Sequence, residues 1–258
     1  MSRMPVLFVG HGSPMNAVEN NAFTAAWEKL PGQIEKPRAI LCISAHWYTR
    51  GTRTHDTSRP RIIYDMYGFP EQLYKVKYPA PGAPELAKRT AQMLSCAVTI
   101  DNEWGFDHGA WSVLCRMYPN ADIPVYQLSV DLLAPAAAHY ALGQALAPLR
   151  GEGVLILGSG NVVHNLALLD WDREGGFPWA VEFDAYIRDH IVSGNHADVV
   201  HYEKAGSSAR YAFYTPDHFY PLLYVLGAAG PHEKVQVFNE SCLMGSMSMT
   251  GYLIGDTL

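Results

Sequence analysis

The sequence has little cysteine, no long hydrophobic run and no block of basic residues. Its four cysteines are far apart and show no Cys-x-x-Cys spacing, so we expect buried, reduced thiols. No stretch of roughly 18 apolar residues occurs, which predicts no transmembrane helix and no membrane partner. A net charge of -6 without a basic run argues against nucleic acid as a partner.

Signals for nucleotide binding, a serine nucleophile and export are also missing. No Gly-x-Gly-x-x-Gly or Gly-x-x-x-x-Gly-Lys-Ser/Thr sequence occurs, so phosphate-binding loops are not indicated. Gly158-Ser159-Gly160 lacks the Gly-x-Ser-x-Gly pattern of a nucleophile elbow. The start, Met1-Ser2-Arg3-Met4, leads within three residues into the first apolar strand. This leaves no room for a signal peptide, so we expect a cytoplasmic protein.

What the chain does contain is typical of one globular α/β domain. A hydrophobic fraction of 48% and a charged fraction of 17% exclude disorder, and 258 residues bury a substantial core. We expect a single domain over residues 1–258, with a mostly parallel central sheet flanked by helices and a site at the carboxyl ends of the strands.

Three short apolar runs are each followed by a histidine. Residues 4–10, 38–44 and 153–157 precede His11, His46 and His164, respectively. Runs this apolar are typical of strands buried on both faces, as in a parallel sheet. Because ligands bind beyond the carboxyl ends of such strands, the pattern predicts that the three histidines meet at one rim of the sheet.

Helices are expected between the strands, with one long polar segment after His46. That segment, residues 47–84, is rich in tyrosine; it is expected to form a lid or a pocket wall, with its rings either stacking on a planar substrate or packing on the core. Thr215 is expected to cap a helix that has Pro216 at its first position. Further helices are expected over 16–30, 83–94, 110–118, 134–149, 178–192 and 198–204, and strands over 97–100, 123–130, 234–238 and 246–254.

Five of the eleven histidines lie at expected strand ends or helix starts, namely His11, His46, His108, His164 and His218. Their convergence predicts a metal site, and imidazole nitrogen suits zinc, iron or copper. The second ring nitrogen of each ligand needs an orienting partner, for which Ser13, Ser44, Asp107 and Asn161 are candidates. The other histidines, His55, His139, His190, His196, His201 and His232, are expected to be solvated.

With these residues in view, the chain resembles the 4,5-DOPA dioxygenase extradiol family, within the class III, LigB-type extradiol dioxygenase superfamily. The resemblance extends from the first strand to the last long helix, and its motifs are specific as a set. They are Gly10-His11-Gly12-Ser13-Pro14-Met15, Ser44-Ala45-His46-Trp47, Tyr78-Pro79-Ala80-Pro81-Gly82, Trp104-Gly105-Phe106-Asp107-His108-Gly109, Gly158-Ser159-Gly160-Asn161-Val162-Val163-His164-Asn165 and Thr215-Pro216-Asp217-His218.

The resemblance implies that His11 and His46 bind a catalytic metal, with His218 as the third ligand and His108 as the acid/base residue. His164 is included among the metal-site residues, either as a further ligand or as a residue beside the metal. The implied reaction inserts both atoms of O2 into a catechol such as L-DOPA, breaking the ring bond beside the two hydroxyls. The implied cofactor is one divalent metal per chain.

The residue matched as third ligand departs from the superfamily pattern. Non-haem oxygenases use two histidines and one carboxylate, whereas the matching position here is His218. Three histidines also suit catalytic zinc, so zinc is expected in the isolated protein, and Fe(II) is expected for the oxygen chemistry. Two other functions stay open: a zinc-dependent hydrolase or lyase on the same scaffold, and a binding module without catalysis.

Overall fold

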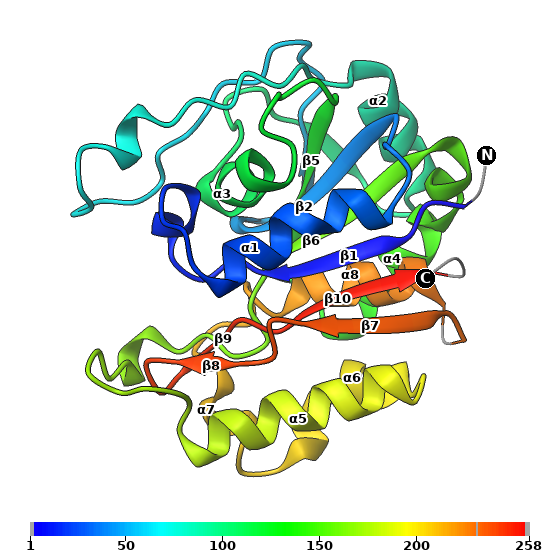
Figure 1. The fold of residues 1–258 in the computed structure, drawn as a ribbon. Coiled ribbons are helices and arrows are strands. Elements are labelled where there is room, and N and C mark those ends of the chain that lie inside the picture. The colour runs from blue at the N-terminus through cyan, green and yellow to red at the C-terminus, as the bar shows by residue number, and fades with distance from the viewer. Residues whose placement is uncertain (1–2, 231, 256–258) are drawn as a thin grey trace.

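A computed structural model describes residues 3–230 and 232–255, which form a central sheet with helices on both faces (Figure 1). The strands are β1 (Val6–Gly10), β2 (Ala39–Thr49), β3 (Thr52–Thr54), β4 (Val98–Ile100), β5 (Val125–Asp131), β6 (Val154–Gly160), β7 (Lys234–Phe238), β8 (Cys242–Leu243), β9 (Met247–Ser248) and β10 (Gly251–Gly255). Eight of them form the main sheet in the order β4-β3-β5-β2-β6-β1-β10-β7. Met1 and Ser2, which precede the first predicted strand, lie outside the described residues.

The centre of the sheet is parallel and one edge is antiparallel. β6 pairs in parallel with both β1 and β2, and β2 does so with β5, whereas β10 runs antiparallel to β1 and to β7. Every residue of β1 and β6 is buried, as expected for strands covered on both faces. The predicted class, an α/β fold with a mostly parallel sheet flanked by helices, is therefore confirmed.

The helices follow the predicted order with shifted ends. The predicted helix over 16–30 is divided, because Asn21 accepts hydrogen bonds from the backbone amides of Phe23 and Thr24 and so starts a new helix within it. The helices are α1 (Ala22–Lys29), α2 (Pro84–Met93), α3 (His108–Met117), α4 (Ala136–Leu146), α5 (Pro178–Val192), α6 (His196–Val200), α7 (Ala209–Ala212) and α8 (Tyr220–Ala229). The 3₁₀ turns are η1 (Pro14–Ala17), η2 (Leu30–Gln33), η3 (Leu73–Lys75), η4 (Ala147–Glu152), η5 (Leu166–Leu168) and η6 (Tyr202–Ala205).

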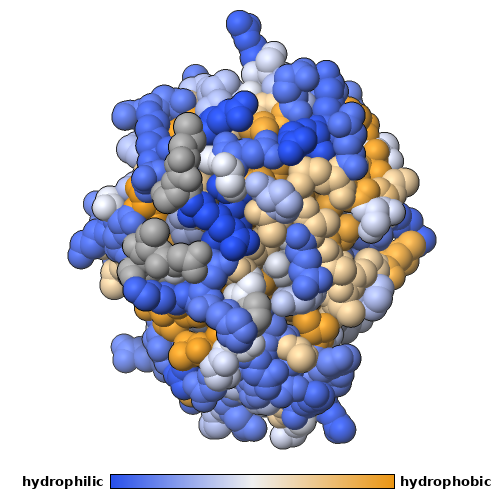
Figure 2. Space-filling view, turned by 90° about the vertical axis from the view of Figure 1, so that its right-hand side faces the viewer, coloured by the Kyte–Doolittle hydropathy of each residue, from blue (hydrophilic) through white to orange (hydrophobic). Residues whose placement is uncertain are grey.

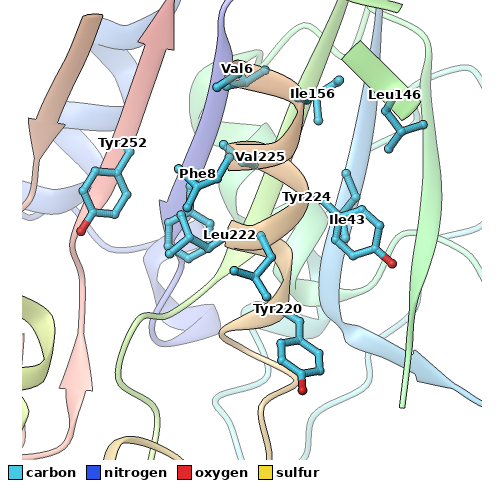
Figure 3. Close-up of a cluster of buried hydrophobic side chains, with 14 of the residues drawn as sticks. Val6, Phe8, Ile43, Leu146, Ile156, Tyr220, Leu222, Tyr224, Val225 and Tyr252 are labelled. Atoms are coloured by element: carbon cyan, nitrogen blue, oxygen red, sulfur yellow. The ribbon is translucent and has the colours of Figure 1, made fainter. Parts of the chain in front are cut away.

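Helix α8 is the centre of the larger core. All ten of its residues are buried, and it lies across the face of the sheet, where Leu222 and Val225 accompany Phe8 and Ile156 (Figure 3). Helix α4 covers its outer side. A Cβ on Gly143 would lie 2.3 Å from the carbonyl oxygen of Tyr224, so glycine allows the two helix backbones to touch. The carboxyl end of β6 and the residues before α8 are thereby fixed relative to one another.

The two ends of the parallel strands differ in character. Figure 2 looks onto the end where these strands begin, and hydrophilic side chains cover much of it, with weakly hydrophobic residues toward its right. The predicted site lies at the other end, beyond the carboxyl ends of the strands. In the described part of the chain, no helix is both long and apolar enough to cross a membrane.

The predicted start of the last long helix is wrong. Thr215 does not cap it, and the helix begins at Tyr220 with Pro221 in its first turn. The hydroxyl of Thr215 instead donates to a carboxylate oxygen of Asp217, and residues 216–219 form a turn. This local hydrogen bond competes with helix capping, as threonine and aspartate side chains commonly do.

Three of the histidines expected to be solvated are buried. His55 and His139 have no exposed surface, and His196 is 5% exposed. The ring of His139 lies 4.3 Å from that of Tyr220, and its Nδ1 shares a hydrogen bond with the Tyr224 hydroxyl. For His139 the prediction is wrong because a single polar residue on an apolar helix leaves no periodic signal. His55 directly follows β3 and His196 is the first residue of the short α6, and at such positions the sequence has no periodicity that could indicate burial.

Because of the buried histidines, we expect the free energy of unfolding to decrease at acid pH. Burial lowers the pKa of His139 to about 4, whereas an unfolded chain has a histidine pKa of about 6.5. The unfolded state therefore binds a proton first as the pH falls from 6.5 to 4, and stability is lost across that window. We expect the loss of unfolding free energy between pH 7 and pH 5, measured in urea, to be about 2 kcal/mol smaller in His139→Gln.

The matched control is His201→Gln, because the His201 side chain is 56% exposed. This variant should lose as much stability as the wild type between the two pH values. Equal losses in His139→Gln and the wild type would contradict the expectation.

Candidate metal centre

Two parallel strands on either side of β6 bring two of the predicted histidines to one rim. His11 directly follows β1, and its backbone amide donates to the carbonyl of Gly160 at the end of β6. His46 lies within β2, which continues beyond its predicted end at residue 44. The pairing of β2 with β5 shifts register between Ile43 and Tyr48, and irregularities of this kind re-aim side chains near functional sites.

The nitrogen atoms of three histidines form a compact cluster. One ring nitrogen from each of His11, His46 and His218 lies within 4.8 Å of the other two, an arrangement that could hold a metal ion. The Nε2 atoms of His11 and His46 are only 3.1 Å apart. Two lone pairs repel at this distance unless a proton or a cation lies between them, so the geometry fits a shared cation.

The other ring nitrogen of each of these histidines faces an oxygen. Nδ1 of His11 lies 3.0 Å from the hydroxyl of Ser159, which itself donates to the carbonyl of Gly109. That hydroxyl therefore accepts the proton of His11 Nδ1, which leaves Nε2 with a free lone pair.

Carboxylates face the Nδ1 atoms of the other two histidines. His218 Nδ1 is 2.5 Å from Asp217, and His46 Nδ1 is 3.3 Å from Asp65. The Nε2 of His218 is buried without a hydrogen-bond partner among the described residues. Oxygen partners on Nδ1 and open Nε2 atoms are the usual arrangement of imidazole ligands.

The orienting partners predicted from the sequence are wrong. Ser44 and Asp107 bond to each other, with 2.6 Å between their oxygens, and Asn161 donates to the carbonyl of Ser248. The Ser13 hydroxyl accepts from the backbone amide of Met15. None of these contacts involves an imidazole.

Burial favours the neutral forms of the His11 and His46 imidazoles by lowering their pKa values. Loss of hydration, reinforced by the nearby His218 and His108, holds the pKa of His11 well below its usual range. Burial and the adjacent His108 likewise lower the pKa of His46. Neutral imidazoles are the forms that coordinate metals, so these two side chains need no deprotonation near neutral pH.

His108 stands beside the cluster at the start of α3. Its backbone amide donates to one oxygen of Asp65, and its Nδ1 lies 3.0 Å from the other. The rings of His108 and His46 are 3.8 Å apart. His46, Asp65 and His108 also form a possible cation-binding group, but here His46 presents Nδ1, the nitrogen that faces away from His11.

Asp107 fixes the start of α3 and thus the position of His108. It is fully buried and accepts hydrogen bonds from Ser44, Gln127, Trp104 and the backbone amide of Ala110. Burial raises the pKa of this carboxyl, an effect to which Asp65 adds and which the side-chain hydrogen bonds oppose.

His164, the third strand-end histidine by pattern, is close to the cluster but outside it. Its ring stacks on that of His218, with centroids 3.5 Å apart and planes 9° from parallel. Its backbone amide donates to the carbonyl of Ala212. The structure therefore brings all five predicted histidines to one place, with His11, His46 and His218 forming the group of converging nitrogens.

Gly160 allows the backbone of His218 to pack closely against the end of β6. A Cβ on this residue would lie 2.0 Å from the carbonyl oxygen of His218, and that carbonyl accepts a hydrogen bond from the amide of Asn161. The Gly158-Ser159-Gly160 sequence thus positions two members of the cluster, with Ser159 on His11 and Gly160 against His218.

The cluster forms the floor of a cavity of about 430 Å³. One wall comes from the long polar segment, through Met66 and Phe69, as expected for a pocket wall. No tyrosine of that segment is among the described residues that line the cavity. Tyr64 lies against Trp111 and Tyr78 is 3% exposed within the core, whereas Tyr67 is 93% exposed.

Three residues that complete the centre were not predicted as orienting partners. Asp65 lies in an irregular segment, 43 positions before His108, whose backbone amide donates to it. No local spacing in the sequence therefore predicts this contact. Ser159 belongs to the Gly158-Ser159-Gly160 sequence, which lacks a nucleophile pattern and gives no sign of a histidine partner. Asp217 adjoins His218 in the predicted motif, and its position beside a histidine was the one available signal.

Taken together, the fold and this centre define an α/β protein with a histidine cluster that could hold a metal ion, beneath a cavity at the carboxyl rim of a parallel sheet. Residues 5–254 match the family described as the catalytic LigB subunit of aromatic ring-opening dioxygenase. The chain therefore belongs to the LigB family. The predicted family and the predicted enzyme class, a ring-cleavage dioxygenase, are confirmed.

Relatives match over nearly the whole chain. A 4,5-DOPA dioxygenase extradiol of Escherichia coli strain K12 is 46% identical, covering 98% of this chain and 96% of the relative. A protein of the same name from Beta vulgaris is 42% identical, covering 97% and 96%, respectively. A crystal structure of an uncharacterized Escherichia coli K12 protein, 43% identical, superposes with a TM-score of 0.86 over 98% of this chain and 100% of that one.

Proposed function

We propose that the protein is a metal-dependent extradiol dioxygenase that inserts both atoms of O2 into a catechol. The main support is the group of three imidazoles with converging nitrogens, at the floor of a cavity, in a chain of the LigB family. The names of the relatives make L-DOPA the first catechol to assay. The ring bond broken is the one beside the two hydroxyls.

His11, His46 and His218 are the proposed metal ligands. The open lone pair of His11 and the unpartnered Nε2 of His218 are the donors that such a site needs. Imidazoles suit zinc, iron and copper; we propose Zn(II) in the isolated protein and Fe(II) for turnover. A redox-active metal at this place supplies the electron transfer that lets O2 react with a catechol.

His108 is the proposed acid/base residue. Asp65 holds its Nδ1 side, so Nε2 is the atom left to take a proton from a catechol hydroxyl. The same carboxylate stabilises the imidazolium that forms, as a carboxylate beside a catalytic histidine does. His164 remains a metal-site residue; its stacking on His218 favours contact with the substrate over ligation.

Oxygen consumption tests the proposed reaction. Protein loaded with Fe(II) in the absence of air is mixed with aerated L-DOPA, and we expect oxygen uptake together with a yellow ring-opened product. The metal-free protein is the control. If no catechol consumes oxygen under these conditions, the proposal fails.

Replacing His108 by glutamine should separate acid/base catalysis from metal binding. We expect kcat to fall by about 10² to 10⁴, the usual contribution of a positioned acid/base group, while metal content stays at the wild-type value. Steady-state oxygen uptake and elemental analysis measure the two quantities. An unchanged kcat would exclude this role.

A zinc-dependent hydrolase or lyase is the alternative, because three imidazoles leave a fourth position open on tetrahedral zinc. Metal-dependent turnover without oxygen uptake would identify it. We further propose that residues 1–258 work as one LigB-type domain in the cytoplasm. A single unfolding transition in calorimetry and recovery in the cytoplasmic fraction are the corresponding measurements.

A further inference from the structure

The cavity above the histidines is larger than a single aromatic ring requires. Its volume is about 430 Å³, whereas a cavity of about 150 Å³ accommodates benzene in a protein core. A catechol ring with its hydroxyls toward His11 and His46 would occupy the floor. The remaining space is therefore available to a substituent on that ring.

The walls around this remaining space are apolar. No aspartate, glutamate, lysine or arginine is among the described residues that line the cavity. Three of its side chains are methionines, which adapt to ligands of different shape. The apolar lining consists of Pro14, Met66, Phe69, Leu166, Leu169, Trp171, Met244 and Met247.

The carboxylates that contact the lining histidines are already engaged. Asp65 contacts His46 and His108, and Asp217 contacts His218. Arg173, close in sequence to the wall, has its guanidinium 4.6 Å from the centre of the Phe177 ring. An ammonium or carboxylate on a bound substrate would therefore find no free counter-charge among the lining residues.

Two observations indicate that the walls of the cavity contact an apolar group of a bound ligand. Trp171 is 77% exposed and Leu166 58% exposed, although both are large apolar side chains at the cavity. Met244 adopts a backbone φ of 48°, a left-handed conformation that is unfavourable for a residue with a side chain. Such strain is concentrated at ligand-binding sites, and the Met244 side chain lines the cavity.

We propose that this site selects catechols that carry an uncharged, apolar substituent, such as an alkyl chain or a second ring, over amino-acid catechols such as L-DOPA. The inference rests on the proposed function and names its substrate class. Each methylene group that leaves water for the apolar walls raises affinity about fourfold. The zwitterionic group of L-DOPA loses hydration without gaining a partner there.

Kinetics on a graded series test the selectivity. Oxygen uptake by the Fe(II)-loaded protein is measured with 4-methylcatechol, 4-butylcatechol, 4-phenylcatechol and L-DOPA. We expect kcat/KM to rise by about tenfold or more from the methyl to the butyl compound, somewhat below the full gain of three buried methylenes. It should also be at least about tenfold higher for 4-butylcatechol than for L-DOPA. A kcat/KM for L-DOPA equal to or above that for 4-butylcatechol overturns the inference.

Paired leucine variants locate the selectivity. Leu166→Ala should lower the ratio of kcat/KM for the butyl and methyl compounds by about threefold or more. Leu133→Ala is the matched control, because Leu133 is 64% exposed and does not line the cavity, and it should keep the wild-type ratio. Equal ratios in the two variants would place the selectivity elsewhere and contradict the proposal.

Binding without turnover separates this inference from the proposed reaction. Calorimetric titration of the zinc-loaded protein with the same compounds should give the same order of affinity. If no compound consumes oxygen but the butyl compound binds about tenfold more tightly than L-DOPA, the proposed reaction fails and the selectivity stands. Tighter binding of L-DOPA overturns the selectivity whatever the turnover.

Discussion

His46→Ala is expected to abolish both metal binding and oxygen uptake. His46 supplies one of three converging nitrogens, and its Nε2 lies 3.1 Å from that of His11. The alanine variant leaves two imidazoles for the metal, and it also removes the ring that packs 3.8 Å from His108. We expect metal content after gel filtration to fall close to zero and ring cleavage to fall below detection.

The control for this loss is His232→Ala. His232 is exposed and is not among the described residues that line the cavity, so this variant should keep the wild-type metal content and activity. In Asp217→Asn we expect an intermediate effect, a fall in metal affinity of about 10- to 100-fold, because Asp217 contacts the Nδ1 atom of the proposed ligand His218. Full metal content in His46→Ala would remove this residue from the proposed ligand set.

The clustered histidines were predictable from the sequence because their positions follow from local patterns. Uninterrupted apolar runs predicted buried parallel strands, and the carboxyl ends of such strands share a rim. His11 lies where this reasoning puts it. His46 lies inside a longer strand than expected, because the irregular pairing of β2 with β5 lets the strand continue past residue 44.

The sequence placed the supporting carboxylate poorly because its contacts are distant and irregular. Asp65 meets His108 across 43 positions, and only the path of the long polar segment brings it there. His164 reaches the rim that the strand pattern predicts, but the pattern does not decide whether it joins the group of converging nitrogens. Three residues separate it from the end of β6, and in the structure its ring stacks on that of His218, outside the group of three converging nitrogens.

The largest expected effect on stability comes from Arg150→Met. Arg150 has no exposed surface, and its guanidinium donates to the carbonyls of Met4, Ala228 and Ala229 and to the carboxylate of Glu233. These contacts join the residues before β1, the end of α8 and the approach to β7. Loss of one partner of a buried ion pair costs about 3 to 5 kcal/mol, so we expect a decrease of that size in the urea-derived free energy of unfolding.

A double variant separates two contributions to the lost stability: that of the Glu233 carboxylate and that of the carbonyls that lose their donor. In Arg150→Met the buried Glu233 carboxylate keeps only its contact with the partly exposed Arg3, at 3.3 Å. Removing that carboxylate as well, in Arg150→Met with Glu233→Leu, should return part of the lost stability, while the three carbonyls still lack their donor. The exposed pair of Lys88 and Glu85, at 3.3 Å, is the control, and Lys88→Met should leave the free energy unchanged within error. If Arg150→Met is as mild as Lys88→Met, the buried arginine does not join these three segments energetically.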